Sequence, residues 1–449
     1  MEVLAIDMGS SSLRAVLGTW EDGNLQQREI FRREHEVQVD SEGAYWDVEA
    51  LRSGALEACR ALGHAPDAVT VDGWGVDYVL VDDAGNPVAP AWAYRDRRGE
   101  QGRKLIQLPE REQFQLSGVA VQDINSLYRL VQQSDLLGTV MFVQDWVAKQ
   151  IAQADLEGWA PPVKVSPWAS RAVASTSGLL TADHRQWCQT LLQVAGQPTM
   201  PPVRDERTVI AQRGKTSLVR GGSHDTACAV YALDLQAGDV FVSCGSWAVV
   251  GMVTENALLS EAAYRAGITN EATCDNRNRA QLNLPGMWIS QECRRWWKDQ
   301  GLDVSYSLLD QLTAAAPRSE HLIDPTLAHL AEPGEMPLKL HELTGIDPLD
   351  RGAMLRLVTD SVARRIITAI DTLREVTQMR GRVILLGGGT KDPQLVASLQ
   401  AGLAEPLIVG PSEASALGAI LASLHTIGVT SGETRHWAHG AALLRTANE

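Results

Sequence analysis

Aspartates and small residues gather at the ends of several short apolar segments, and together these residue types can bind phosphate. Residues 7–12 (Asp-Met-Gly-Ser-Ser-Ser) place a carboxylate beside a turn that offers hydroxyls and backbone N–H groups. Such a turn can hold phosphate oxygens, and the aspartate can lie near a magnesium ion. Residues 243–246 offer similar groups, and the glycines at 387–389 let a phosphate or a flat ligand approach the backbone. Asp225 follows another apolar segment and is a candidate general base.

Each of these features also has an ordinary structural explanation, which stays open when the feature is taken alone. A glycine–serine turn commonly closes a tight hairpin, and an aspartate after a strand commonly caps a helix. One further phosphate-binding motif is excluded, because a residue that it requires is missing. Gly214-Lys215-Thr216 resembles the end of a Walker A loop, but Val209 stands where that loop needs its first glycine.

The charge of the chain restricts its partners. The 449 residues include 55 acidic and 40 basic ones, which gives a net charge of −15. A nucleic-acid backbone or an anionic membrane surface needs clustered Lys and Arg, so we expect neither as a partner. The N-terminus shows no basic region ahead of an apolar stretch, and no apolar run approaches the ~18 residues of a membrane span. We therefore expect a cytoplasmic protein, with its six cysteines reduced and mostly buried.

Two hairpins with the same plan indicate two similar halves. Residues 3–7 and 13–17 are predicted strands joined by a turn of small residues. Residues 238–253 repeat the sequence of strand, small-residue turn and strand. The repeat places a domain boundary near residue 233, with domains at 1–232 and 233–449.

Helices alternate with the strands, which favours the α/β class. Residues 350–379 carry apolar side chains at helical spacing and predict a long amphipathic helix. A β-branched strand at 382–386 leads into the triple glycine, and Asp392-Pro393 is a typical helix start. Residues 411–424 predict a helix whose alanines and glycines allow close packing.

Taken in order, these motifs resemble the FGGY family of carbohydrate kinases, and within it most closely the rhamnulokinase branch. The most specific combination is Trp-Gly-Val-Asp at 74–77 with Ser-His-Asp-Thr at 223–226. The matching stretches follow the family order and cover residues 5–14, 72–81, 93–96, 125–128, 223–230, 243–251, 283–291, 385–389 and 413–418.

The resemblance implies two ribonuclease-H-like α/β domains, as in actin and hexokinase, with a cleft between them. It also implies an ATP-dependent kinase that phosphorylates the 1-hydroxyl of a ketose, with L-rhamnulose or L-fuculose as the expected substrate. The sugar would lie against the N-terminal half, and ATP would lie against the C-terminal half.

The resemblance also implies roles for individual residues. Asp225 is implied as the general base, and Asp7 is implied to lie near Mg²⁺. The residues implied to contact ATP are Ser10, Ser11, Ser12, Leu13, Arg14, Ser246, Gln291, Gly387, Gly388 and Gly389. The residues implied to line the sugar pocket are Gly75, Asp77, Asn125, His224, Thr226 and Asn283, with Trp74 expected beside the sugar.

Some positions depart from the family pattern, and other functions stay open. Relatives carry Thr where this chain has Ser246, Gln-Asn where it has Lys391-Asp392, and a later Gln where it has Ala397. The nucleotide preference, the stereochemistry of the ketose and the oligomeric state therefore remain open. One alternative is a kinase for another pentulose, a hexulose or a sugar acid. Another is a non-catalytic sugar sensor or ATPase scaffold on the same fold, which would not need a base at Asp225.

Overall fold

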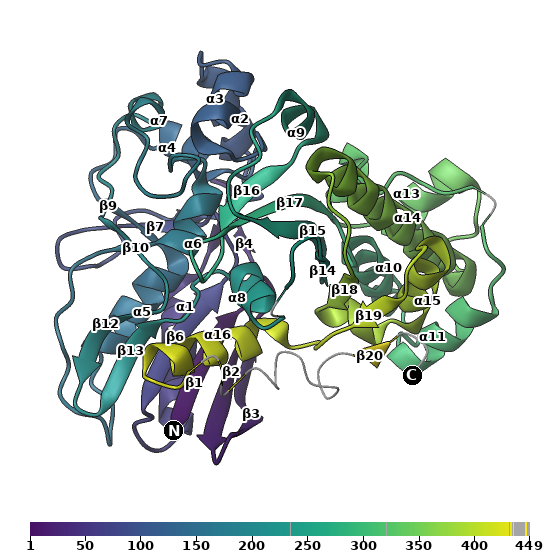
Figure 1. Ribbon diagram of the computed structural model, residues 1–449. Helices are drawn as coiled ribbons and strands as arrows, with labels where there is room; N and C mark the ends of the chain where they lie inside the picture. Colours follow the sequence, from purple (N-terminus) through teal and green to yellow (C-terminus); the bar gives the residue numbers. More distant parts are fainter. Residues whose placement is uncertain (234, 320, 431, 433, 435–444, 447–449) are drawn as a thin grey trace. The chain divides into compact units, whose positions relative to one another are not determined.

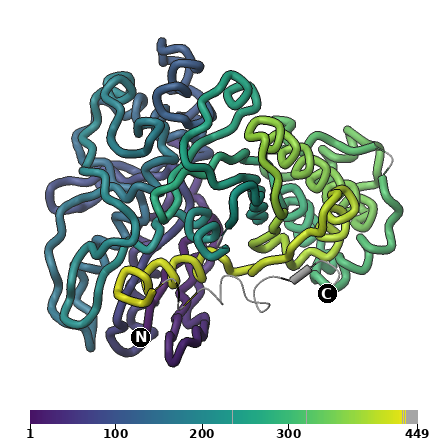
Figure 2. Tube along the Cα trace, in the orientation of Figure 1, coloured from purple at the N-terminus to yellow at the C-terminus, as the bar shows by residue number. Residues whose placement is uncertain are grey.

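The chain folds into two compact units that are not continuous in sequence. The computed structural model describes residues 1–233, 235–319, 321–430, 432, 434, 445 and 446. Unit 1 contains the described residues of Met1–Asp234, Thr254–Ala280 and Ala414–His439, and unit 2 those of Leu235–Val253, Gln281–Glu413 and Gly440–Glu449. Figure 2 shows the last helix of unit 1, in yellow, beside the purple N-terminal strands. The domain division after residue 232 stays a prediction.

The elements of unit 1 are mostly short. Its strands are β1 (Glu2–Met8), β2 (Ser12–Glu21), β3 (Asn24–Glu34), β4 (Gln38–Val39), β5 (Ala44–Trp46), β6 (Ala68–Gly73), β7 (Tyr78–Val81), β8 (Ala91–Trp92), β9 (Thr139–Phe142), β10 (Ala169–Ser170), β11 (Val203–Arg204), β12 (Thr208–Arg213), β13 (Thr216–Arg220) and β16 (Thr269–Ala272). Its helices are α1 (Val48–Ala61), α2 (Arg98–Leu105), α3 (Glu110–Ser117), α4 (Ser126–Val131), α5 (Val143–Gln153), α6 (Arg171–Ala174), η1 (Ser175–Ser177), α7 (Gln189–Val194), α8 (Asp225–Tyr231), α9 (Glu261–Ala266) and α16 (Ala414–Thr426).

The elements of unit 2 include the longest helix. Its strands are β14 (Val240–Cys244), β15 (Trp247–Thr254), β17 (Asn278–Pro285), β18 (Val383–Leu386), β19 (Leu407–Val409) and β20 (Arg445–Thr446), of which β15 and β17 run across the division. Its helices are α10 (Trp288–Asp299), α11 (Tyr306–Ala315), α12 (Ala328–Ala331), α13 (Met336–Thr344), α14 (Arg351–Thr377), η2 (Gly388–Lys391) and α15 (Pro393–Gly402).

The main sheet of unit 1 has the strand order β12-β13-β6-β1-β2-β3. Strand β1 pairs antiparallel with β2 and parallel with β6. Because side chains alternate along a strand, Leu4, Ile6 and Met8 point to one face, where they join the core formed by α1 and α5. Asp7 points to the other face, on which α8 and α16 contact β6 (Figure 1). Both faces are covered, so an ionisable group at this position must be buried.

Unit 2 repeats the hairpin plan at its centre. Strand β14 pairs antiparallel with β15 and parallel with β18, and β18 pairs parallel with β19. Helix α14 buries an apolar stripe that includes Leu357, Val362 and Ile366. The side chain of Asp350, the residue before the helix, caps its first turn by accepting a hydrogen bond from the backbone N–H of Ala353. The helical spacing in the sequence therefore corresponds to a buried helix face.

Most of the predicted elements are confirmed. The two hairpins, the strand at 383–386 and the helix after Asp392 form as expected, and the Asp392 side chain accepts from two backbone N–H groups as the N-cap of α15. The helix predicted at 411–424 begins three residues later, at Ala414. Asp225 lies at the start of helix α8 and not at a strand end, since β13 already ends at Arg220.

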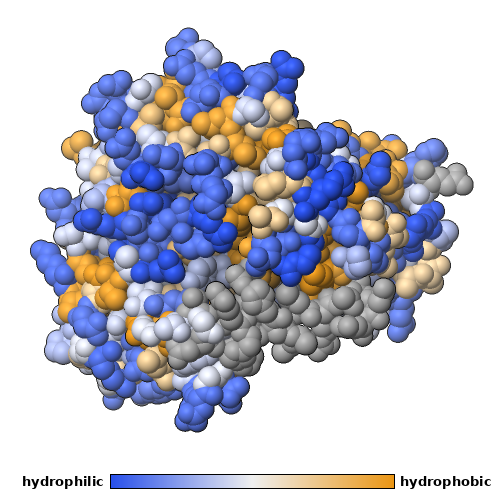
Figure 3. Space-filling view, in the orientation of Figure 1, coloured by the Kyte–Doolittle hydropathy of each residue, from blue (hydrophilic) through white to orange (hydrophobic). Residues whose placement is uncertain are grey.

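The surface and the thiols agree with the composition. Figure 3 shows hydrophilic side chains over much of the face that it draws, with hydrophobic residues in smaller groups among them. All six cysteines are buried and free, as predicted. Among the described residues, no helix is long and apolar enough to cross a membrane.

Two helices of unit 1 approach each other so closely at Gly418 that the position has no room for a side chain. A Cβ at Gly418 of α16 would overlap the backbone carbonyl of Cys228 in α8, whereas a Cβ at Gly54 of α1 would make an ordinary contact of 3.6 Å with Leu13. We expect Gly418→Ala to destabilise the protein by about 1–3 kcal/mol, because backbone cannot move aside easily. The matched change Gly54→Ala should stabilise it by up to about 1 kcal/mol, since alanine favours a helix interior. Midpoints of urea unfolding test both signs, and a neutral Gly418→Ala would contradict this packing.

Candidate active site

Two aspartates lie side by side at the carboxyl ends of parallel strands. Asp7 of β1 and Asp72 of β6 are direct partners in the ladder, so their side chains leave the sheet on the same face. Asp7 is 2% exposed and forms an ion pair with Arg14 of β2. The carboxyl ends of parallel strands are where α/β folds commonly bind ligands.

Asp225 belongs to the same group of carboxyl groups. It is the first residue of α8, and its Oδ1 accepts hydrogen bonds from the backbone N–H and the hydroxyl of Thr226. Its side chain is still 32% exposed, so a ligand can reach it. The loss of solvation by the surrounding protein, together with the negative charge of Asp7, raises the pKa of Asp225 to about 6. A carboxylate with this pKa accepts a proton more readily than an ordinary aspartate.

Asp72 was not singled out from the sequence, although it ends an apolar strand just as Asp7 does. It is fully buried, and neither of its oxygens has a hydrogen-bond partner among the described residues. Burial, and then the charges of Asp7 and Asp225, raise the pKa of Asp72 well above its usual range. The raised pKa favours the neutral form of the Asp72 carboxyl, and this form limits the negative charge at this edge of the sheet.

The predicted phosphate turn is a tight turn between β1 and β2. Gly9 donates its backbone N–H to the carbonyl of Ser12 at 2.9 Å. Ser10 and Ser12 are half-buried and Ser11 is exposed, so their hydroxyls lie at or near the surface of unit 1. Leu13 is 1% exposed and packs in the core, so only its backbone is available to a ligand.

The predicted sugar residues Gly75 and Asp77 belong to a strained turn after β6. Val76 has a φ of 65°, which is rare for a β-branched residue. Its N–H donates to Thr176 Oγ1 at 2.8 Å, and its carbonyl accepts from Ser126 and Arg129. Surrounding residues thus hold a backbone conformation that would not persist alone.

The Asp77 carboxylate is occupied by protein groups. It accepts from the indole N–H groups of Trp46 and Trp74 and forms an ion pair with Arg129 at 2.7 Å. The two indole rings lie 4.4 Å apart, and the Asp77 side chain is 1% exposed. Burial raises the pKa of Asp77, while Arg129 and the indoles favour its charged form. Asp77 therefore fixes the tryptophan pair and the turn. Asn125 is also buried, and its Oδ1 accepts from Gln122 N.

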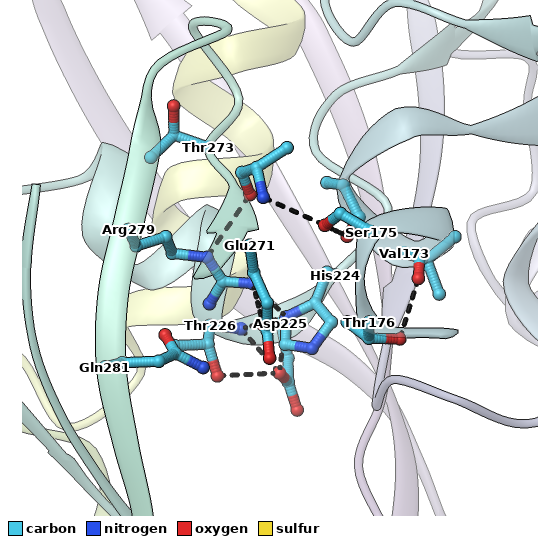
Figure 4. A network of polar contacts seen from close by, with 12 residues as sticks. Val173, Ser175, Thr176, His224, Asp225, Thr226, Glu271, Thr273, Arg279 and Gln281 are labelled. Atoms are coloured by element: carbon cyan, nitrogen blue, oxygen red, sulfur yellow. Dashed lines mark hydrogen bonds and ion pairs between the residues drawn. The ribbon is translucent and has the colours of Figure 1, made fainter. Parts of the chain in front are cut away.

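His224 and Thr226 flank Asp225. The His224 ring caps α8, because Nδ1 accepts from the backbone N–H of Thr226 at 3.1 Å. Burial, followed by the positive charge of Arg279, keeps the pKa of His224 well below its usual value, so the ring is neutral. The Nδ1 atom also lies 3.3 Å from Asp225 Oδ1, a contact that a neutral ring does not turn into an ion pair. Figure 4 shows these side chains with Glu271 and Arg279.

Of the predicted nucleotide residues, unit 2 contains Ser246, Gln291 and the triple glycine. Ser246 Oγ donates to Gln291 Oε1 at 2.8 Å, and the backbone N–H of Met287 donates to the carbonyl of Gly245, which ties this turn to the residue before α10. Gly387 has a φ of 81°, and a Cβ there would lie 2.9 Å from the carbonyl oxygen of Cys244. The glycine turn and the serine turn are therefore neighbours, as a phosphate site requires.

The remaining predicted residues of unit 2 have local partners. Asn283 lies on β17, and its Oδ1 accepts weakly from Gln281 Nε2 at 3.4 Å. Lys391 pairs with Glu413 at 3.2 Å. The structure thus groups Asp7, Asp225, His224 and the turn at 9–12 in unit 1, and Ser246, Gln291, Asn283 and the triple glycine in unit 2.

The donor set fits a magnesium ion that is held largely by water and phosphate. Within the described part of the chain, no three His, Cys, Asp or Glu side chains form a ready metal cage. Mg²⁺ commonly binds proteins through only one or two carboxylates. Asp7, at the end of β1, offers a carboxylate oxygen of that kind.

Comparisons with known proteins agree with this geometry. Residues 240–427 match the C-terminal domain of the FGGY family of carbohydrate kinases. Two curated relatives are named rhamnulokinase. The one from Bacteroides thetaiotaomicron is 25% identical over 94% of this chain and 90% of its own, and the one from Enterobacter sp. (strain 638) is 28% identical over 94% and 89%.

Solved structures share the fold. Ligand-bound xylulose kinase from Lactobacillus acidophilus has a TM-score of 0.75 at 12% identity and covers 99% of this chain and 92% of its own. Plasmodium falciparum glycerol kinase with ADP has a TM-score of 0.73 at 11% identity, covering 98% and 92%. The expected α/β fold of the actin and hexokinase type is confirmed. Residues 240–427 thus carry the C-terminal domain of the FGGY carbohydrate kinases, and the chain is similar over most of its length to relatives named rhamnulokinase, which supports an ATP-dependent sugar kinase.

Proposed function

We propose that this kinase phosphorylates the 1-hydroxyl of a ketose, with L-rhamnulose as the first candidate and L-fuculose as the second, and that Asp225 is the general base. The sugar class follows from the relatives named rhamnulokinase. The role of Asp225 is supported by one observation above all. It is a partly exposed carboxylate whose pKa is raised to about 6, near physiological pH, by burial and by the charge of Asp7.

The reaction requires one proton transfer and one phosphoryl transfer. Asp225 accepts the proton of the sugar hydroxyl while that oxygen forms its bond to the γ-phosphorus, and ADP leaves with the electrons of the broken P–O bond. The hydrogen bonds from Thr226 hold Oδ1 of the base in place. Phosphoryl transfer depends mainly on alignment and on neutralising charge, so a fixed base and fixed phosphate contacts are the main requirement.

Unit 1 and unit 2 supply different parts in this proposal. The turn at Ser10–Arg14 and the Arg14 guanidinium contact the transferred phosphate, while Ser246, Gln291 and the triple glycine contact ATP. Asp7 would hold Mg²⁺, which supplies positive charge that neutralises the phosphate oxygens. Gly75, Asn125, His224, Thr226 and Asn283 line the sugar pocket, and Asp77 acts through Trp74 and the turn that it fixes.

The first test replaces the base by its neutral isostere. Asp225→Asn should lower kcat at least about a hundredfold on the preferred ketose, since loss of a positioned base typically costs this much or more. The measurement is ADP release over a panel of ketoses with ATP and Mg²⁺. The control is Asp82→Asn, which changes an exposed carboxylate in the turn after β7 and should keep the full rate. If Asp225→Asn keeps most of the rate, the base is assigned wrongly, and if no ketose releases ADP, the substrate class is wrong.

The second test is the pH dependence of the wild-type enzyme. A base must be ionised, and the pKa of Asp225 is raised to about 6. We therefore expect kcat/KM for the sugar to rise about tenfold per pH unit up to pH 6 and to level off above it. Initial rates between pH 5 and pH 8, at saturating ATP and Mg²⁺, give this profile. A rate that stays constant down to pH 5 would contradict the assigned pKa.

The third test concerns the nucleotide side. The Ser246 hydroxyl donates to Gln291 in the structure and can turn its hydrogen to a phosphate oxygen instead. Because a hydrogen bond to a charged group contributes about 1.5–3 kcal/mol, Ser246→Ala should lower kcat/KM for ATP roughly ten- to a hundredfold. KM for the sugar should not change. Ser246→Thr keeps the hydroxyl and should keep the rate, and equal losses in both variants would exclude a hydroxyl contact.

A further inference from the structure

The two nitrogens of the His224 ring have different surroundings. Nδ1 accepts the backbone N–H of Thr226 at 3.1 Å, and the Nη2 of Arg279 approaches it at 3.4 Å. These two neighbours are donors and favour a lone pair on Nδ1. One acceptor, Asp225 Oδ1, lies 3.3 Å from Nδ1, but it already accepts from the backbone N–H and the hydroxyl of Thr226. In a neutral imidazole the proton then resides on Nε2.

Arg279 reaches His224 from a buried position on β17. Its side chain is fully buried, and its Nη2 forms an ion pair with Glu271 Oε2 of β16 at 2.6 Å. Its Nε donates to the carbonyl of Ala272 at 3.2 Å. The Nη2 atom of the guanidinium therefore contacts both Glu271 of β16 and the histidine ring, and Figure 4 shows the three side chains together. Neither Arg279 nor Glu271 was singled out from the sequence.

Stability alone does not explain this ion pair. The free-energy cost of removing two charges from water commonly exceeds the attraction between them in a buried ion pair. A protein with apolar residues of similar size at such positions is often as stable. The Glu271 side chain is 6% exposed and that of Arg279 is 0% exposed, so both charges lose nearly all of their hydration. A role in orienting the neighbouring ring explains why both charges are present.

The Nε2 edge of the ring lies beside Gly75. A Cβ on Gly75 would lie 2.9 Å from His224 Nε2 and 2.9 Å from Thr176 Oγ1. Thr176 already donates its hydroxyl to the carbonyl of Val173 at 2.7 Å. Glycine at position 75 therefore leaves room beside Nε2 that the Cβ of any other residue would fill.

We propose that Arg279, held by Glu271, is a positioning residue that fixes His224 as the Nε2–H tautomer, and that His224 donates this hydrogen to a sugar oxygen other than the one phosphorylated. The inference rests on the proposed function for its ligand, a sugar with an acceptor oxygen close to the reacting hydroxyl. Asp225 follows His224 directly in the chain, so acceptance of one proton and donation of one hydrogen bond occur side by side.

The first measurement needs no substrate. Ring ¹⁵N spectra of the full-length protein, labelled at histidine, distinguish the tautomers, and the signals of His224 are those lost in His224→Asn. We expect an unprotonated Nδ1 and a protonated Nε2 in the wild type, and a mixture of tautomers in Arg279→Met. A protonated Nδ1 in the wild type, or an unchanged pattern in Arg279→Met, would overturn the proposal.

The second measurement is kinetic, on the sugar that the ketose panel identifies. Arg279→Met should raise KM for the sugar roughly tenfold, as the loss of one oriented hydrogen bond would, and should leave KM for ATP unchanged. Arg279→Lys keeps the charge and should recover part of this loss. If the tautomer follows the prediction but KM does not change, the positioning role is wrong. If no ketose is phosphorylated, the proposed substrate fails while the spectra still decide the tautomer.

A matched ion pair far along the chain serves as the control. Arg356 and Asp360 on α14 form a buried pair whose side chains are 10% and 11% exposed. Arg356→Met should lower stability without changing the His224 spectrum or KM for the sugar. Should Arg279→Met fail to fold, Glu271→Gln releases the guanidinium without removing it and is expected to shift the same ring signals. Unchanged signals in a folded Glu271→Gln would count against the proposal.

Discussion

The burial of several carboxyl groups on one face of a mixed sheet is the constraint on which the site of unit 1 depends. The register of β1 and β6 places Asp7 and Asp72 directly beside each other, and α8 adds Asp225 near them. Like charges at such separations, removed from water, cannot all be ionised. The structure resolves the conflict in three ways. Arg14 pairs with Asp7, the raised pKa of Asp72 favours its neutral form, and Asp225 remains partly exposed with a raised pKa. The repulsion between these carboxylates destabilises the fold, but it also raises the pKa of Asp225, which can then accept a proton near neutral pH.

The position of that carboxylate depends on backbone contacts made far along the chain. Helix α16 comes from the end of the sequence and lies against both α8 and the strands that carry the aspartates. Gly418 lets α16 touch the backbone of α8 at Cys228, and Gly221 fits beneath Ala419 and Thr70. Backbone contacts of this kind leave little freedom for α8 to shift. Asp225, as the first residue of α8, is thus fixed by the core and not by its own side-chain contacts alone.

Local sequence patterns predict the parts of this structure that depend on local physics. The hairpins, the long helix α14 and the Asp392 cap follow from alternation, helical spacing and capping preferences, and they form where expected. The return of residues 254–280 and 414–434 to unit 1 follows from tertiary packing, which no local pattern records. For the same reason no local pattern marks Arg279 as a site residue. It is 55 residues from His224 in the sequence and contacts it only in the folded structure. Asp77 illustrates the intermediate case. Its motif is visible in the sequence, but the occupation of its carboxylate by Trp46, Trp74 and Arg129 is not.

The charge state of His224 connects this network to the strength of the base. A protonated imidazole 3.3 Å from the Asp225 carboxylate would favour its ionised form and would lower its pKa towards that of an ordinary aspartate. A base with a lower pKa takes a proton from a hydroxyl less readily. Arg279 opposes protonation of the ring and, by its own charge, lowers the pKa of Asp225 somewhat, while Glu271 carries the opposite charge, so the pair that orients the histidine has no net charge. In a protein with a net charge of −15, where phosphate must be held by local donors, this balance lets Asp225 remain basic while cations such as Arg14 act on the phosphate side.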